Sequence, residues 1–307
     1  MAGAGLMINL EEATDLYDEA ISLVKSTFES ASQGLPIDGR PIAEVVGRIC
    51  ENIAFGDRGI LTLASRSTPR NYLYAQSVNV CILSILVGAG LGYDTASLNE
   101  LGIAALLHDI GMVRVLEIAQ RPRRLTDAEH AEIRKHTLYG IEILQKATDL
   151  SEAALFVCKN HHAYQKGEKI PLDVSARLRE YAQITGLVDI YVAITQSRPY
   201  REAKLSHEAI REIIGEAGAD FFDTRIIKTL VSQIGVYPVG SWVRLNNNEV
   251  GRVTAQNSYF PLRPEVEILF DADGRALVEP KVYDLFQKQV LYIREPADLT
   301  KLRLERT

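Results

Sequence analysis

Apolar residues recur at three- and four-residue spacing from Glu11 to about Ile234, as in LEEATDLYDEAISLVKSTF and DTRIIKTLVSQI. This spacing places them on one face of an α-helix, and the alternation typical of strands is scarce in the same region. Stretches containing glycine or proline, such as 34–39 and 121–122, interrupt the pattern at ordinary helix stops. The pattern therefore predicts a mainly α-helical chain.

After Gly235 the pattern changes to short runs such as SWVRL, EVGRVTA, EVEILF and QVLYI. Turn-forming residues at 246–248, 261–264 and 271–274 separate these runs, which predicts a small antiparallel β-barrel. The DADG sequence at 271–274 lacks the glutamate of a calcium loop, so we expect a hairpin turn there. The expected division is a helical leader over 1–65, a central helical domain over 66–234 and the barrel over 235–307.

The composition is that of a globular protein that can fold without disulfide bonds. The chain has 307 residues, of which 47% are apolar and 24% charged, enough to bury a core without disulfides. The net charge of −6 argues against a broad nucleic-acid surface, which needs a concentrated basic face. A small anionic substrate in a metal pocket remains compatible with this charge.

The cysteines and the apolar stretches indicate the compartment. Cys50, Cys81 and Cys158 are far apart and surrounded by apolar residues, as expected for reduced thiols in a cytoplasmic protein. The N-terminal residues lack the charged and apolar regions of a signal peptide, and the apolar stretch 78–91 contains Asn79 and Ser84. We expect neither a signal peptide nor a membrane span.

The strongest local signal for chemistry is LGIAALLHDIGM, where His108 and Asp109 follow an apolar helical run. A buried ionised carboxylate is costly unless a cation or several donors compensate it. An adjacent imidazole and carboxylate could therefore share metal ions. Taken alone, the pair also fits a capped helix end or a hydrogen-bonded core histidine.

Further histidines and a further aspartate lie in apolar helical segments downstream. RKHTLYGIEIL contains His136, with Gly140 one turn later for close packing; VCKNHHAY ends on His161 and His162; and QITGLVDIYVAIT contains Asp189. Each has an ordinary structural alternative, a polar helix end for the histidines and a paired core carboxylate for Asp189. Their joint occurrence favours one shared metal site.

The segments HDIGM, HTLYG, HH and VDIYVAITQSRPYR, in this order, resemble the HD-GYP branch of the HD superfamily. The resemblance runs from about Asn71 to Ser232, and IGVYPVGSWVRLNNNEVGRV is similar to a barrel extension found after some HD-GYP domains. It implies an HD-type helical bundle that holds two divalent metal ions, iron or manganese, and hydrolyses cyclic di-GMP.

The resemblance also implies a role for each residue of the cluster. His108 and Asp109 are the expected catalytic pair, and Asp109 bridges both ions. The expected ligands of one ion are His108 and Asp189, and those of the other are His136, His161 and His162. Mixed imidazole and carboxylate ligands suit iron, manganese or zinc, so the residue types alone do not select the metal.

The SRPYR segment matches a family stretch whose guanidinium groups face the substrate phosphate. Arg198 and Arg201 are therefore candidate phosphate-binding residues, because a planar donor fork suits phosphate geometry. The structural alternative is a solvated loop that follows a helix.

Several positions depart from the family pattern. Gln76 stands where the family has a metal-binding histidine, so it is a doubtful ligand. Tyr72 stands where some members have a carboxylate that binds a third metal ion. Met112 replaces the lysine of HDIGK, and the GYP loop is absent, with Ala163 in place of a glutamate. Lys166 and Lys169 could offer a replacement cation, although solvated loop lysines are the favoured interpretation.

Three functions remain open at this point. The favoured one is a metal-dependent phosphodiesterase acting on cyclic di-GMP or a related cyclic dinucleotide. The second is a catalytically degenerate, metal-containing module that binds nucleotide or a protein partner in signalling, and the third is an HD hydrolase of another phosphate ester. The oligomeric state is open, a dimer included. For the barrel, which carries Tyr237 and Trp242, packing on the helical domain is favoured over peptide binding.

Overall fold

The computed structural model describes residues 10–54, 60, 63–64, 72–121, 123–163, 170, 173–196, 203–218, 222–257 and 259–297. The helices in these ranges are α1 (Leu10–Ser32), α2 (Gly39–Ala54), α4 (Tyr72–Gly90), α5 (Thr95–Leu107), η1 (Ile110–Arg114), α6 (Leu116–Ala119), α7 (Asp127–Ile133), α8 (His136–Leu144), α9 (Glu152–Asn160), α10 (Ala176–Thr195), α11 (Ser206–Glu212), η3 (Ile213–Gly218) and α12 (Thr224–Ile234). The strands are β1 (Trp242–Leu245), β2 (Val250–Ala255), β3 (Glu265–Phe270), β4 (Ala276–Asp284) and β5 (Ile293–Pro296).

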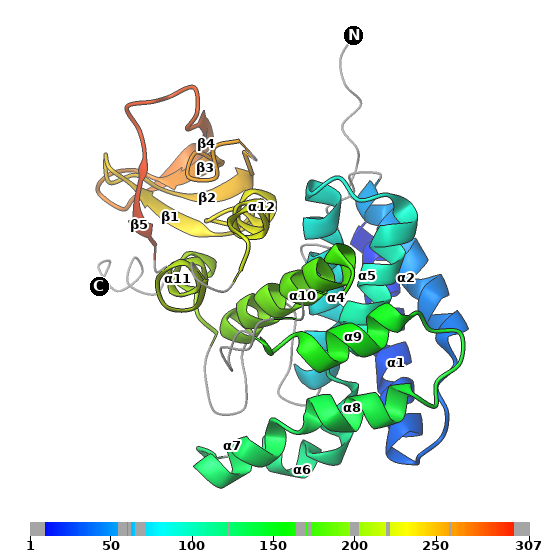
Figure 1. Cartoon of the computed structure of the whole chain (residues 1–307). Coiled ribbons are helices and arrows are strands. Elements are labelled where there is room, and N and C mark those ends of the chain that lie inside the picture. The colour runs from blue at the N-terminus through cyan, green and yellow to red at the C-terminus, as the bar shows by residue number, and fades with distance from the viewer. Residues whose placement is uncertain are drawn as a thin grey trace. The chain divides into compact units, whose positions relative to one another are not determined.

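The chain divides into two compact units. The first contains Met1–Leu205 and Glu212–Ile227, and the second contains Ser206–Arg211 and Lys228–Thr307. Figure 1 shows the helices of the first unit and the strands of the second. The mainly α-helical HD-type fold expected from the sequence is confirmed. The boundaries after residues 65 and 234 stay predictions.

Helix α4 is the centre of the first unit. It packs against α1, α2, α5 and α10 (Figure 1), and its residues from Ala75 to Gly88 are all buried, as in a core helix. Gly88 and Gly102 let α4 and α5 approach, since a Cβ at Gly102 would lie 2.8 Å from Ile85 Cδ1. Of the described helices, α4 alone has the length and hydropathy of a membrane span, and 83% of that span is buried inside the protein.

Local signals fix where the helices near the site begin. Asp94 accepts a hydrogen bond from the Ser97 backbone N–H at 2.8 Å and caps α5. Thr126 and Glu129 form a reciprocal capping box at the start of α7. These caps set the start of α5, which ends at the HD pair, and of α7, which precedes α8.

The second unit holds one antiparallel sheet with the strand order β4-β3-β2-β1-β5. Alternate side chains of β1, β2 and β3 form its core, as period-two strands require. The fully buried members of this core are Val243, Leu245, Val253, Val266, Ile268 and Leu285. Tyr237 packs against the same core and stacks on His207 with ring centroids 5.6 Å apart.

The sheet is open, which corrects the prediction of a barrel. In the described part of the chain β4 and β5 are the two edges and do not pair with each other. Most side chains of β4 are solvent-exposed, and Val278 is 99% exposed. A small closed barrel fills its interior with side chains from every strand, whereas most side chains of β4 face solvent.

Candidate metal centre

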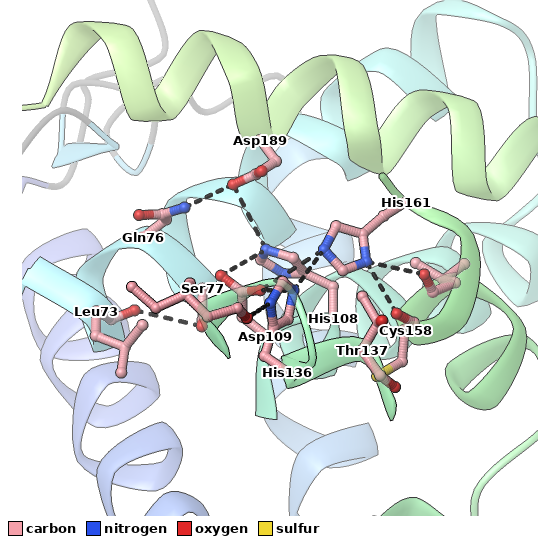
Figure 2. Close-up of polar contacts among 12 residues, drawn as sticks. Leu73, Gln76, Ser77, His108, Asp109, His136, Thr137, Cys158, His161 and Asp189 are labelled. Atoms are coloured by element: carbon pink, nitrogen blue, oxygen red, sulfur yellow. Dashed lines mark hydrogen bonds and ion pairs between the residues drawn. The ribbon is translucent and has the colours of Figure 1, made fainter. Parts of the chain in front are cut away.

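The histidines and aspartates singled out in the sequence converge on one buried cluster in the first unit. Two groups of potential ligand atoms, each within 4.8 Å of one another, share Asp109. The first group contains Asp109, His136, His161 and His162, and the second contains His108, Asp109 and Asp189. Figure 2 shows the side chains of His108, Asp109, His136, His161 and Asp189 pointing toward one another. These residues lie on, or directly after, α5, α8, α9 and α10.

Backbone carbonyls hold three of the imidazoles in a single tautomer. Nδ1 of His108 lies 2.7 Å from the Ala105 carbonyl oxygen, and Nδ1 of His136 lies 2.7 Å from that of Ile133. Nδ1 of His161 lies 3.1 Å from a carbonyl oxygen of α9 (Figure 2). A carbonyl accepts only, so each Nδ1 carries the proton and each Nε2 presents a lone pair to the cluster.

Asp109 is the centre of the cluster. Its Oδ1 lies 3.1 Å from His136 Nε2 and 3.6 Å from His161 Nε2, and its Oδ2 lies 3.4 Å from His108 Nε2. His136 Nε2 and His161 Nε2 are 3.4 Å apart. Because their Nδ1 atoms hold the protons, two lone pairs and a carboxylate face one another here, an arrangement that a shared cation stabilises.

The pKa values show strong coupling between the buried groups. Burial lowers the pKa of His108, but Asp109 and Asp189 outweigh it and hold the pKa well above its usual value. Burial raises the pKa of Asp109, but His108 and His136 outweigh it and hold that pKa well below its usual range. Without another cation, protons on these imidazoles therefore balance the buried carboxylates. Metal ligation replaces such protons at Nε2.

Two buried atoms of the cluster lack a hydrogen-bond partner among the described residues. His108 Nε2 and Asp109 Oδ1 are fully shielded from solvent, and neither atom has a hydrogen-bond partner there. Buried polar atoms of folded proteins are normally satisfied, so such atoms call for an explanation. Mixed imidazole and carboxylate donors suit a divalent transition metal. The cluster fits a divalent metal site.

Two glycines bring the halves of the first group together. A Cβ on Gly111 in η1 would lie 1.9 Å from the His136 carbonyl oxygen and 2.4 Å from the Gly140 nitrogen. A Cβ on Gly140 would lie 2.3 Å from Cys158 Sγ of α9. Asp109 directly precedes η1 and His136 begins α8, so this crossing sets the distance between the two ligands.

Gln76 enters the second group from α4. Its Nε2 donates a hydrogen bond to Asp189 Oδ1 at 2.6 Å (Figure 2), and both side chains are buried. The same oxygen lies 3.6 Å from His108 Nε2. Gln76, predicted from the sequence to be a doubtful metal ligand, is in this structure a hydrogen-bond donor to a candidate ligand.

Comparison with known proteins identifies the family of the chain. Residues 62–226 match the HD domain, and residues 242–304 match the KOW domain associated with HD domain. The chain belongs to the HD domain family. The resemblance to its HD-GYP branch is confirmed, and this HD protein lacks the GYP tripeptide.

Two relatives of this HD protein are named as enzymes. Cyclic di-GMP phosphodiesterase PA4108 from Pseudomonas aeruginosa is 31% identical, covering 92% of this chain and 69% of the relative. Cyclic di-GMP phosphodiesterase PdeB from Borreliella burgdorferi is 26% identical, covering 65% of this chain and 52% of the relative. The chain thus spans about two thirds of the first relative and half of the second.

A solved structure shares the fold. Bd1817, an HDG"Y"P protein from Bdellovibrio bacteriovorus, superimposes with a TM-score of 0.57 over 75% of this chain and 73% of its own. The two sequences are 16% identical, so this likeness concerns the fold alone.

Arg198, Arg201, Lys166 and Lys169 lie outside the described residues. Met112 is buried at 9% exposure and is part of the apolar core. The position that carries a lysine in HDIGK is therefore a packing position here.

Sequence reasoning missed two features of the cluster. It did not identify Gly111, although the glycine is visible in HDIGM, and it assigned Gln76 no partner. The Gln76–Asp189 hydrogen bond joins residues 113 positions apart, and no local pattern indicates such a contact.

Proposed function

We propose that this HD protein is a metal-dependent phosphodiesterase that hydrolyses cyclic di-GMP or a related cyclic dinucleotide. The observation that carries the proposal is one buried cluster in which imidazole Nε2 atoms and two carboxylates face one another. Hydrogen bonds from Nδ1 to backbone carbonyls orient the His108 and His136 rings. The names of the two relatives support the same chemistry and substrate class.

The proposed ligands divide as the two donor groups do. Asp109 belongs to both groups and is the proposed bridge, with His136, His161 and His162 at one ion and His108 and Asp189 at the other. Two divalent ions, iron or manganese, would supply a Lewis acid for the phosphoryl oxygens and lower the pKa of water. His108 and Asp109 are the proposed catalytic pair.

The chain's own residues prepare the site for an anion. The carbonyls of Ala105 and Ile133 accept from Nδ1 of His108 and His136 and so orient the two rings, and an imidazole ligand adds no negative charge. Asp109 and Asp189 alone contribute negative charge to the two groups, less than two divalent cations supply. The loaded centre would therefore be positive and attract a phosphodiester despite the net charge of −6. Arg198 and Arg201 stay predicted phosphate-binding residues.

The test is turnover of cyclic di-GMP by anaerobically purified protein, with iron, manganese and zinc quantified in the same sample. Asp109→Asn should reduce both hydrolysis and metal content to background, because it removes the charge shared by the two groups. Asp173→Asn is the matched control, since Asp173 is exposed and outside the cluster. Hydrolysis at the wild-type rate by Asp109→Asn would refute the mechanism.

One observation favours a second candidate function, a metal-containing, nucleotide-binding signalling module without turnover. Gln76 engages Asp189 through a hydrogen bond instead of offering an imidazole to a metal. Metal-loaded protein would then bind cyclic di-GMP and leave it intact. Hydrolysis of any cyclic dinucleotide in a panel that includes 3'3'-cGAMP would exclude this second function. A cytoplasmic location and a protein partner stay predictions under either function.

A further inference from the structure

We infer that Gln76 makes the two cation positions of the cluster unequal, so that the group around His136, His161 and His162 fills first and the group around His108 and Asp189 fills only when the Gln76 amide leaves Asp189. The inference rests on the proposed metal site and concerns the order in which the site is loaded. Gln76 acts through Asp189 and is a positioning residue.

The first step concerns the atom that Gln76 engages. Gln76 Nε2 donates to Asp189 Oδ1 at 2.6 Å, and this oxygen faces His108 Nε2 at 3.6 Å. Oδ1 is therefore the oxygen that a cation shared with His108 would use. The hydrogen of an amide N–H carries positive charge, which repels a cation at the same oxygen.

Burial makes this hydrogen bond difficult to replace. Gln76 and Asp189 are each 6% exposed, so bulk water does not compete for either partner. A hydrogen bond to an ionised group is among the stronger ones in proteins, and breaking it exposes two polar groups to a poorly solvated interior. A cation that takes Asp189 Oδ1 must offset that loss.

The carboxylate oxygen of the other group, Asp109 Oδ1, receives no amide hydrogen bond from the described residues. Asp109 Oδ1 lies 3.1 Å from His136 Nε2 and 3.6 Å from His161 Nε2, and it has no hydrogen-bond donor within the described part of the chain. A cation there gains a carboxylate oxygen and Nε2 lone pairs without displacing an amide. It also relieves the close approach of the His136 and His161 Nε2 atoms, which are 3.4 Å apart.

These contacts predict stepwise loading. Displacing one hydrogen bond to a charged group should weaken the second ion by on the order of 10- to 100-fold relative to a site without the amide. Wild-type protein should therefore hold one equivalent of Mn²⁺ tightly and a second weakly. At one equivalent, the electron paramagnetic resonance spectrum should be that of an isolated Mn²⁺ ion.

The experiment titrates Mn²⁺ into metal-free full-length protein by calorimetry, without substrate, and follows the same samples by paramagnetic resonance. Gln76→Met removes the donor with little change of shape, and Gln76→Glu replaces it by an acceptor. Both variants should tighten the second ion by on the order of 10- to 100-fold and leave the first unchanged. Gln145→Met is the matched control because Gln145 is exposed at the end of α8.

Each outcome decides between the inference and the proposed function. Two equivalents bound with equal affinity by wild-type protein, or a second affinity that neither Gln76 variant changes, would overturn the inference. If Gln76→Met does not fold, the Gln76→Glu titration carries the same decision. Stepwise binding without hydrolysis by the fully loaded protein would refute the proposed function alone, and protein that binds no Mn²⁺ would overturn both.

Discussion

The closest backbone approach in the cluster gives the sharpest stability prediction, the change Gly111→Ala. An added Cβ would lie 1.9 Å from the His136 carbonyl oxygen and 2.4 Å from the Gly140 nitrogen. Carbon atoms prefer partners about 3.5 Å or more away, and both obstructing atoms belong to the backbone. Helix α8 must therefore move away from η1 by about 1 Å or more.

The displacement has two measurable consequences. Overpacking of this kind costs about 1–3 kcal/mol, and with no flexible side chain to yield we expect about 3 kcal/mol, which lowers Tm by about 6–12 °C. The Asp109–His136 contact of 3.1 Å widens with the helix. A misplacement of about 1 Å costs roughly 100-fold in rate, so turnover should fall by that order and bound metal should decrease.

The assay combines calorimetric unfolding, metal analysis and turnover on the same preparation. Gly47→Ala is the matched control. Gly47 lies inside α2, where alanine favours the helix by about 1 kcal/mol, and the added Cβ would make an ordinary contact of 3.4 Å with Asn99 Nδ2 of α5. Gly111→Ala protein with the wild-type Tm and metal content would show that the η1–α8 crossing does not set the ligand distance.

Three further predictions concern the metal, a helix cap and alkaline pH. Chelation should lower Tm, since an ion at about 100 times its Kd stabilises the folded state by about 2.7 kcal/mol; an unchanged Tm after complete metal removal would contradict this. Thr126→Ala should cost about 1 kcal/mol by removing the capping box of α7 while leaving the metal content unchanged, as urea unfolding and metal analysis will show. Burial raises the pKa of Cys50 from 9.0 to about 12, so the folded chain keeps a proton that the unfolded chain loses. The free energy of unfolding should therefore fall as pH rises from 9 toward 12, and Cys50→Ala should make that fall shallower in urea titrations; an equally steep fall would count against the burial argument.

Much of the fold is predictable from the sequence, because the buried side of a helix or strand requires apolar residues at a regular spacing. The helical spacing before residue 234 and the short runs after it correspond to the described helices and strands. Closure of the sheet was not predictable in this way. Whether β4 pairs with β5 depends on the exposure of residues such as Val278, which strand patterning alone does not determine.

The cluster was predictable as a set of residues, and its internal geometry was not. Histidines and aspartates at the ends of apolar helical runs indicate a buried polar site, because such groups are costly to bury singly. Gln76 and Asp189 lie on different helices and 113 positions apart, so their hydrogen bond follows only from the packing of α4 on α10.

One regularity links the positions of the histidines in the sequence to the geometry of the cluster. His108 follows α5, His136 lies three residues after the end of α7, and His161 follows α9. The last carbonyls of a helix have no intrahelical partner, and in each case the imidazole Nδ1 lies within 3.1 Å of one of them, the carbonyl oxygen of Ala105, Ile133 or Cys158. A helix end thus satisfies its own orphan acceptor and fixes the tautomer that aims Nε2 at the cluster. A histidine at a helix end, followed by packing glycines such as Gly111 and Gly140, is therefore a signal for an oriented ligand that sequence reasoning can use.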